Sequence, residues 1–412
     1  MELDEHLFRR EAGRLVAALT RVFGVHNLAL AEDVVQDAFC RAIEVWKAQG
    51  LPDNPAAWLM TTAKRRALDI VRRERTARTF APEVSYLLES EQKLGALFDD
   101  AFAAGAIRDE QLRMMFSCCQ PQLPENAQIA LILNVLCGFG PGEIAAAFLA
   151  SRAAIEKRIS RGKKELAAAK RLFDLSAADF EARLSTVQRA LYLLFNEGYH
   201  GASPEAAVQQ QLCDEARRLV GLLREHPPAA TPSTHALAAL MCLHAARLGE
   251  KLDAAGELTP LAAQDRSRWD ATLTREGLAL LERAASGDAL SAYHLEAAIA
   301  AIHASAESLE ATDWASIVGL YDRLLQMAHS PVVALNRAIA LSRRDGPAQG
   351  LLAAREITDE RLSTYPFYAA TLAELELACG NPEAARRHFR DALGLARSDA
   401  ERRFLEKRLA AC

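Results

Sequence analysis

The N-terminal part of the chain, up to about Arg75, carries apolar positions at the spacing of α-helices. Apolar residues between Leu15 and Val22 recur every three or four positions, and Gly24 follows, which predicts a helix that ends before this glycine. A second helix is expected from about residue 31 to 48. The turn-forming stretch 50–55 then predicts a loop, and Pro55 suits the first turn of a third helix that runs to about residue 73.

A different helical pattern follows between residues 125 and 172. The segment Glu125–Cys137 is apolar on more than one side, which predicts a buried helix, and Gly138–Gly140 interrupts it. Pro141 suits the start of a short helix, and Ser151 is a favoured N-cap for a third helix from Arg152 to about Leu172. This order of elements predicts a helix-turn-helix unit whose last helix is strongly basic.

From about Leu184 onward, the sequence pattern predicts helices separated by short breaks that contain Gly or Pro. Gly346 and Gly380 are separated by the same interval as Leu341 and Leu375, and each glycine precedes an Ala-rich helix. This interval, about 34 residues, is the period of tetratricopeptide (TPR) repeats, so at least two such units are predicted in residues 330–412. Stacked helix pairs of this kind usually bind a protein or a peptide.

Composition agrees with this pattern. The chain of 412 residues is longer than one hydrophobic core usually supports, aromatic residues make up 6%, and Gly (21) and Pro (15) are scarce. We therefore expect an all-α protein with two small helical domains followed by a helical-repeat domain. Charges interrupt every apolar run before it reaches membrane-spanning length, and no signal peptide is present, so a cytoplasmic location is expected. The eight cysteines lack zinc-site spacing and are expected to be reduced thiols, with no metal and no cofactor.

Local charge changes the picture that the net charge of −5 suggests. Residues 58–80 carry a net charge of +5, residues 81–111 carry −5, and residues 150–173 carry +6. A single charged run is typical of an ordinary solvated helix face. Two basic helical segments around an acidic connector, one of them in a helix-turn-helix pattern, instead indicate two modules that bind nucleic acid.

Three motifs resemble the extracytoplasmic-function (ECF) class of bacterial RNA polymerase sigma factors. The resemblance covers about residues 5–173 and rests on AEDVVQDAFCRAIEVW, NPAAWLMTTAKRRALDIVRRER and LPENAQIALILNVLCGFGPGEIAAAFLASRAAIEKRISRGKKEL, in that order. The chain departs from the family where Lys64-Arg65 replaces a common Arg-Asn pair. From about Ser176 onward the chain is similar to the long TPR-like extension of one ECF subgroup, including the stretches LFNEGYHG and QDRSRWD.

The resemblance implies a domain order and a task for each domain. Residues 1–80 would be sigma region 2, residues 81–110 an acidic linker, residues 111–175 sigma region 4, and residues 176–412 the extension. Region 2 would bind the β′ subunit of core RNA polymerase through a polar helix face consisting of Asp33, Gln36, Asp37 and Arg41. It would also bind the −10 promoter element, through Asn54, Lys64, Arg65, Arg66, Arg72 and Arg73.

Region 4 would bind the −35 element as duplex DNA. The implied residues of its last helix are Arg152, Glu156, Lys157, Arg158, Arg161, Lys163 and Lys164. Arg152 and Lys157 are the candidates for base contacts, because arginine and lysine can donate hydrogen bonds to guanine. Glu156 could accept a hydrogen bond from a cytosine amino group or pair with a neighbouring cation, and both interpretations stay open.

Two polar clusters in the extension are candidates for a ligand or partner site. The first comprises Asn196, Glu197, Tyr199 and His200, and the second comprises Gln264, Asp265, Arg266, Ser267, Arg268, Trp269 and Asp270. The second is the stronger candidate because many polar groups adjoin an aromatic one, with Asp265, Arg266, Arg268 and Trp269 as its central residues. The alternative is that both clusters make only hydrogen bonds between helices.

The predicted function is that of a sigma factor, which binds core polymerase and promoter DNA and catalyses nothing itself. The extension would regulate this factor or bind a protein or peptide in its groove, and no membrane contact is expected. One alternative is a stand-alone helix-turn-helix regulator that binds DNA without polymerase. Another is an enzyme or metabolite-binding helical protein, although no Gly-rich phosphate loop or nucleophile motif is present.

Overall fold

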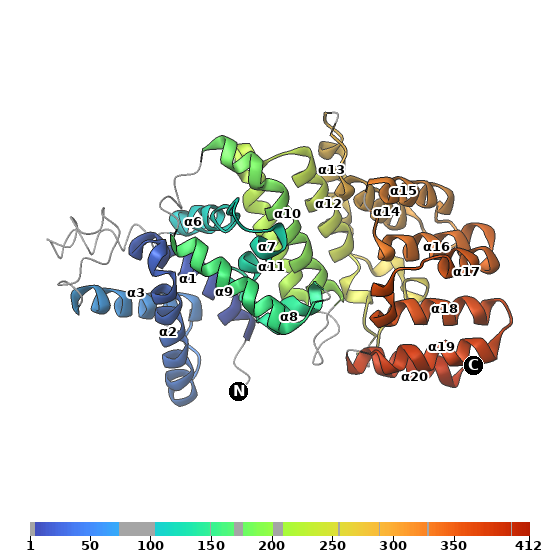
Figure 1. The fold of residues 1–412 in the computed structure, drawn as a ribbon, viewed down its shortest axis with the longest axis horizontal. Coiled ribbons are helices and arrows are strands. Elements are labelled where there is room, and N and C mark those ends of the chain that lie inside the picture. Colours follow the sequence, from blue (N-terminus) through green and yellow to red (C-terminus); the bar gives the residue numbers. More distant parts are fainter. Residues whose placement is uncertain are drawn as a thin grey trace. The chain divides into compact units, whose positions relative to one another are not determined.

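The computed structural model describes residues 5–73, 104–148, 150–168, 176–200, 209–253, 256–287, 289–327, 329–396 and 398–412. Two compact units divide the chain, Met1–Leu194 and Phe195–Cys412, and their boundary falls inside one long helix. Every regular element among the described residues is a helix (Figure 1), and the only extended pairing there is an isolated bridge between Leu252 and Leu258. The prediction of an all-α protein is therefore confirmed.

The first unit contains the helices that the sequence pattern predicts around the two basic segments, and also α6, which this pattern does not predict and which begins within the expected acidic linker. Their bounds are α1 (Glu5–Phe23), η1 (Val25–Asn27), α2 (Leu28–Gln49), α3 (Pro55–Arg73), α6 (Ala104–Ser117), α7 (Glu125–Val135), α8 (Pro141–Ala147), α9 (Arg152–Ala168) and α10 (Ala177–His200). The predicted breaks at Gly24, Pro55 and Pro141 all coincide with helix ends. Residues 74–103 lie outside the described residues, and they include most of the acidic connector predicted over residues 81–110.

The core of the first three helices forms around α1. Leu15 and Leu19 of α1 and Trp46 of α2 are almost completely buried. The Trp46 ring stacks on Phe8 at 5.6 Å and meets Trp58 of α3 edge-on at 5.4 Å between ring centroids. Trp58, which is half-buried, therefore packs against this core.

The helices α7, α8 and α9 form the predicted helix-turn-helix unit. Gly138 adopts a positive φ of 69°, which permits the chain to reverse after α7. The Glu143 carboxylate accepts a 2.7 Å hydrogen bond from the Gly140 N–H, and the Ser151 hydroxyl accepts one from the Ala154 N–H at 3.3 Å. Ile155, Ile159 and Leu166 form the buried stripe of α9.

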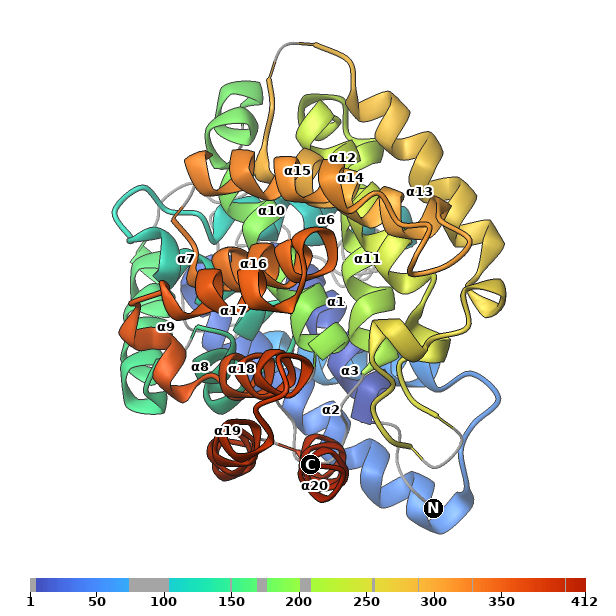
Figure 2. The same ribbon diagram turned by 90° about the vertical axis from the view of Figure 1, so that its right-hand side faces the viewer.

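The second unit consists of successive helices that pack against their neighbours in the chain (Figure 2). Their bounds are α11 (Gln210–Glu225), η2 (Pro227–Ala229), α12 (Pro232–Ala245), η3 (Leu248–Glu250), η4 (Leu261–Ala263), η5 (Arg266–Arg268), α13 (Ala271–Ala284), α14 (Ala292–Ser305), α15 (Trp314–Met327), α16 (Pro331–Asp345), α17 (Pro347–Arg355), η6 (Glu360–Thr364), α18 (Pro366–Ala378), α19 (Pro382–Gly394) and α20 (Asp399–Ala410). None of the described helices combines the length and apolar content that a membrane span requires.

The repeat interval of the sequence recurs in the backbone of this unit. Gly346 separates α16 from α17 with a φ of 96°, and Gly380 lies between α18 and α19 with a φ of 82°. A proline is the first residue of both α17 and α19, and Leu341 and Leu375 are both buried. Two equivalent helix pairs are therefore present in residues 331–394, while their assignment to the TPR class stays a prediction.

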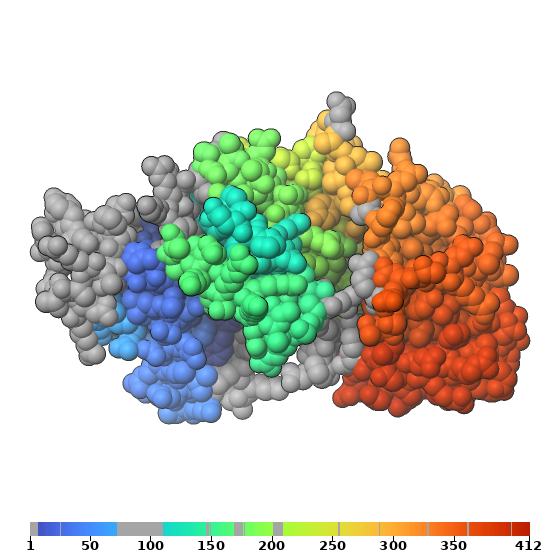
Figure 3. Space-filling view, in the orientation of Figure 1, coloured from blue at the N-terminus to red at the C-terminus, as the bar shows by residue number. Residues whose placement is uncertain are grey.

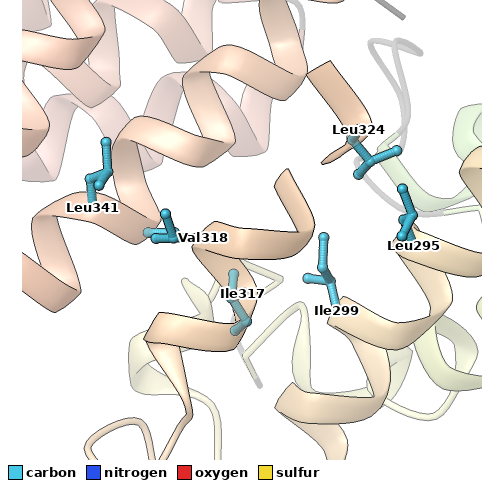
Figure 4. Close-up of a cluster of buried hydrophobic side chains, with 7 residues drawn as sticks. Leu295, Ile299, Ile317, Val318, Leu324 and Leu341 are labelled. Atoms are coloured by element: carbon cyan, nitrogen blue, oxygen red, sulfur yellow. The ribbon is translucent and has the colours of Figure 1, made fainter. Parts of the chain in front are cut away.

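Apolar side chains from consecutive helices form shared cores between these elements. Leu295 and Ile299 of α14 lie in one cluster with Ile317 and Val318 of α15 and Leu341 of α16 (Figure 4). Because this cluster takes side chains from three helices, no single pair of them encloses it.

The cysteines do not pair. All eight are free thiols: five are buried, Cys379 and Cys412 are half-buried, and Cys40 is exposed. Burial raises the pKa of the Cys119 and Cys213 thiols to about 12, so both remain protonated near neutral pH.

The close approach of α16 and α17 makes Gly350 a sensitive position. A Cβ atom at Gly350 would overlap the Ser342 side chain and lie 2.8 Å from the Ala338 carbonyl oxygen. We expect Gly350→Ala to destabilise the unit by about 1–3 kcal/mol, the usual cost of overpacking. Gly394→Ala in α19 is the matched control because its added Cβ would have no atom within 4 Å. Equal unfolding midpoints for the two variants in a thermal scan would contradict this packing.

Candidate polymerase, DNA and ligand sites

The four residues predicted to contact polymerase lie on the solvent-exposed side of α2. Asp33, Gln36, Asp37 and Arg41 are all exposed. The Asp37 carboxylate accepts a 2.9 Å hydrogen bond from Arg66 Nε of α3, and Arg41 pairs with Glu44 at 3.3 Å. This face therefore presents both signs of charge, and one of its acids is shared with the basic helix beside it.

The −10 candidates lie on α3 and at its start. The Asn54 side chain accepts a 3.0 Å hydrogen bond from the Ala57 N–H and so caps the helix. Arg65 is exposed and forms no ion pair with a described residue, whereas Lys64 is half-buried and Arg66 is tied to Asp37. Arg72 and Arg73 lie in the last turn of α3, and their side chains are outside the described part of the structure.

The −35 candidates follow the outer face of α9. This helix lies at the surface of the first unit, in green in Figure 3. Lys157, Arg161 and Lys164 are exposed at helical spacing and have no ion-pair partner among the described residues, and Arg158 is half-buried. Arg152 donates a 2.8 Å hydrogen bond to Glu156, so in this structure Glu156 pairs with a neighbouring cation.

Lys163 differs from the other −35 candidates because it contacts the region 2 segment. Its Nζ donates a 2.7 Å hydrogen bond to Glu32 of α2, and both side chains are about one-third exposed. Sequence inspection missed this pair because the two residues are 131 positions apart. A sequence pattern over a few residues cannot indicate a contact between residues so far apart.

Further contacts join the same two segments of the first unit. Arg9 of α1 pairs with Glu143 of α8 at 3.0 Å and lies over the Phe139 ring. Arg21 of α1 pairs with the buried Glu110 of α6. The predicted −10 and −35 helices therefore belong to segments that pack directly against each other in this structure.

The cluster Asp265–Trp269 has structural roles in the second unit. Asp265 accepts hydrogen bonds from the N–H and hydroxyl of Ser267, which lower the pKa of the Asp265 carboxyl. The Arg266 guanidinium donates to the carbonyl oxygens of His303 and Ala306, each at 2.9 Å, and so caps the end of α14. Arg268 is exposed and pairs with Glu250 at 3.1 Å, and Trp269 is buried. These contacts agree with the alternative of hydrogen bonds between helices.

A cavity of about 270 Å³ lies nearby in the second unit, and sequence reasoning did not identify its charged residues. Arg247 and Lys251 line the cavity with Tyr199 and His200 from one candidate cluster and Gln264 from the other. The signal in the sequence is only a cation pair four residues apart after the apolar helix α12. Nothing in that spacing indicates that Lys251 is buried and Arg247 half-buried.

The interior beside this cavity is electropositive. Burial and the nearby Arg247 lower the pKa of Lys251 to about 7, and burial lowers the pKa of His244 to about 3 and that of His303 to about 4. Both imidazoles are therefore neutral near pH 7, which leaves Arg247 as the permanent cation at the cavity wall.

Comparison with known proteins accounts for most of the chain. A family model described as Sigma-70 region 2 matches residues 7–77, and one described as Sigma-70, region 4 matches residues 113–166. Residues 183–285 match a family described as Family of unknown function (DUF6596). A protein of Rhizobium meliloti (strain 1021), named uncharacterized protein R00370, is 40% identical over 397 residues, which cover 96% of this chain and 92% of that protein. No solved structure matches the chain.

The fold and these matches define an all-helical transcription factor with a DNA-binding helix-turn-helix unit. The chain belongs to the sigma-70 family of RNA polymerase sigma factors, as an ECF-like member with a C-terminal extension. Sigma-70 factors are initiation factors rather than enzymes, and their partners are core polymerase and promoter DNA. The predicted family is therefore confirmed, while the individual contact residues stay predictions.

The exposed cations of α9 lead to a test that needs no known promoter sequence. We expect Arg161→Ala with Lys164→Ala to weaken binding to duplex DNA and to reduce the slope of log K against log salt by about 2, because each lost phosphate contact contributes about 0.9. The control is Arg402→Ala, which removes an exposed cation from α20. Fluorescence anisotropy across a salt series measures the slope, and an unchanged slope in the double variant would count against α9 as the DNA-binding face.

Proposed function

We propose that this protein binds core RNA polymerase and directs promoter-specific initiation, with its C-terminal extension regulating the factor or binding a partner. The observation that carries the proposal is the pair of cationic helices α3 and α9, one in each of the segments that match sigma-70 regions 2 and 4. A stand-alone DNA-binding regulator has no need for a region 2 segment.

The exposed face of α2 is proposed as the contact with the polymerase β′ subunit. Asp33, Gln36, Asp37 and Arg41 can form ion pairs and hydrogen bonds with a charged helical surface. Contacts of this kind orient two proteins and speed their encounter more than they add affinity. Because Asp37 also holds Arg66, polymerase binding at this face would change the electrostatic environment of the −10 helix.

The helix α3 is proposed to hold the −10 element, with Arg65 as its most accessible described cation. Lys64, Arg66, Arg72 and Arg73 would add phosphate contacts. The loop from Leu51 to Asn54 precedes α3, and Leu51 is 51% exposed, which leaves an apolar side chain available to a displaced base. Extruding a base costs a few kcal/mol, so contacts to the exposed strand would favour duplex opening.

The helix α9 is proposed to read the −35 element. Arg152, Glu156 and Lys157 lie near its N-terminus, the part of a recognition helix that meets base edges, and Arg158 follows on the same turn. Arg161 and Lys164 lie further along the exposed face and suit phosphate contacts. Lys163 becomes available to DNA only when it leaves Glu32.

This division of tasks requires the first unit to open. The −10 and −35 elements are named after their positions in the promoter, so they lie about 25 base pairs apart. This separation is about 85 Å of duplex at 3.4 Å per base pair. A compact unit of about 190 residues has a radius of gyration of only about 16 Å. The contacts that join α1 and α2 to α6, α8 and α9 must therefore break before both elements are bound together.

The second unit is proposed to act in cis on this process or to recruit a partner to the promoter. Its helix pairs in residues 331–394 resemble the arrangement of protein-binding repeats. We place the protein in the cytoplasm, where polymerase and promoter DNA are found in bacteria.

Transcription in vitro tests the proposed function directly. Purified core polymerase and a genomic fragment library should yield transcripts only when this chain is added. We expect Lys64→Ala with Arg65→Ala to reduce those transcripts at least tenfold, since losing two charged contacts costs about 1.5–3 kcal/mol each. The control is Arg402→Ala, and copurification with core polymerase should be unchanged in both variants. Library fragments that bind the chain without any core-dependent transcript would favour the stand-alone regulator.

Opening of the first unit has its own test. Glu32→Gln removes the carboxylate that holds Lys163, so DNA binding by the free factor should increase by up to about fivefold, the range of a partly exposed ion pair. Glu44→Gln removes an equal charge from the same helix but releases only Arg41. If both variants gain the same affinity in an anisotropy titration, the gain comes from net charge and the pair does not restrain α9.

A further inference from the structure

The cavity in the Phe195–Cys412 unit is built by segments that are far apart in the sequence. Its walls come from the end of α10, the turn after α12, the segment 258–264, the first turn of α18 and the first two turns of α20. Three aromatic rings, those of Tyr199, Phe367 and Phe404, line it together with Arg247 and Lys251. A volume of about 270 Å³ lies just below the usual range for small-molecule sites, so the cavity suits a small ligand.

Two cations in this wall, the buried Lys251 and the half-buried Arg247, have no carboxylate partner among the described residues. Lys251 is only 8% exposed, and its Nζ donates a hydrogen bond to the Tyr199 carbonyl oxygen. The Arg247 guanidinium lies 5.8 Å from the centroids of both the Tyr199 and Trp269 rings. Neither Arg247 nor Lys251 forms an ion pair with any carboxylate in the described part of the chain.

Buried polar atoms of residues that line the cavity have no hydrogen-bond partner among the described residues, which indicates that a ligand supplies one. Arg247 Nε is buried and has no hydrogen-bond acceptor among the described residues, and Gln264 Oε1 is buried there without a donor. The Gln264 amide is held in place because its Nε2 donates to the Thr259 carbonyl oxygen at 3.0 Å. A buried cation or polar group without a partner destabilises a fold, and such groups concentrate where a ligand supplies the partner.

One carboxylate, that of Glu401, also lines the cavity. Glu401 lies in the first turn of α20 and is 3% exposed. Its carboxylate forms no ion pair with Arg247 or Lys251, and the charged or ionisable groups that act on Lys251 are Arg247 and Cys213. Glu401 therefore does not neutralise the two cations.

We propose that this cavity binds a small organic anion, a carboxylate or phosphate monoester with an apolar body. Arg247 and Lys251 would hold the anionic group, and the apolar body would lie against Tyr199, Phe367 and Phe404. A hydroxyl or N–H on the ligand would satisfy Gln264. The site lies wholly within the second unit, and its test requires neither polymerase nor DNA, so it stands apart from the sigma-factor function proposed above.

Calorimetric titration of the full chain tests the site with defined probes. Benzoate and benzyl phosphate carry a negative charge on an apolar ring, while benzyl alcohol has the ring without the charge and inorganic phosphate the charge without the ring. We expect at least one of the two ring anions to bind with a Kd below about 1 mM and both control compounds to bind at least tenfold more weakly. Absence of binding by both ring anions up to about 10 mM would overturn the proposal, as would equally tight binding of benzyl alcohol.

Two variants assign the binding to the named cations. Arg247→Met and Lys251→Met keep much of the side-chain volume and should each weaken binding of the ring anion at least tenfold. Arg268→Met is the control, because Arg268 is 69% exposed, pairs with Glu250 and does not line the cavity. Thermal scans establish that each variant is folded. An unchanged Kd in folded Lys251→Met, or in folded Arg247→Met, would remove that cation from the site, and unchanged values in both would end the proposal.

The pH dependence of binding gives a second readout for Lys251. With a pKa of about 7, Lys251 is mostly charged at pH 6 and mostly neutral at pH 8, so the Kd should rise up to about tenfold between these values. In Lys251→Arg the charge persists, and this rise should disappear. The ionisable groups that surround Lys251 are unchanged in that variant; they are Arg247, Tyr199, His200, Cys213, His244 and Glu401. The same pH dependence in both proteins would exclude Lys251 as the contact.

Discussion

Removing an unpaired charge from water has a high free-energy cost, and this cost determines which helix faces of the first unit are buried and which are exposed. Each of the helices α3 and α9 buries an apolar stripe, such as Ile155 and Leu166 of α9, and exposes cations on its other side, such as Arg65 of α3 and Arg161 of α9. The core and the basic faces therefore arise from the same helical periodicity. A polyanion such as DNA is the natural partner of a surface with exposed arginine and lysine side chains.

Other cations of the first unit pair with acids that are distant in the sequence. Arg9, Arg21 and Lys163 pair with Glu143, Glu110 and Glu32. Partly exposed pairs of this kind contribute little each, about 1 kcal/mol or less, so the packed arrangement can be reversed by a partner that supplies new contacts. Polymerase and DNA would both compete for groups that now hold the segments together, and the closed first unit would then be a resting state.

The second unit follows a different rule. Its helices bury apolar faces against their neighbours in the chain, yet the buried Lys251 and the half-buried Arg247 have no carboxylate partner among the described residues. Natural proteins retain such unfavourable groups mainly where function requires them, and stability elsewhere in the domain offsets the cost. An extension that binds a small anion would bring chemical information to a transcription factor whose other surfaces recognise only polymerase and DNA.

The sequence by itself determined the helices, their ends and the family, because periodicity, capping residues such as Ser151 and turn residues such as Gly346 act over a few positions. It also indicated which faces of α2 and α9 are exposed. Tertiary structure alone decided that Lys163 meets Glu32, that Arg266 caps α14, and that Lys251 is buried beside Arg247. Burial and long-range pairing depend on how distant segments pack. The residue type alone therefore does not indicate whether a charged side chain will be exposed to water or buried.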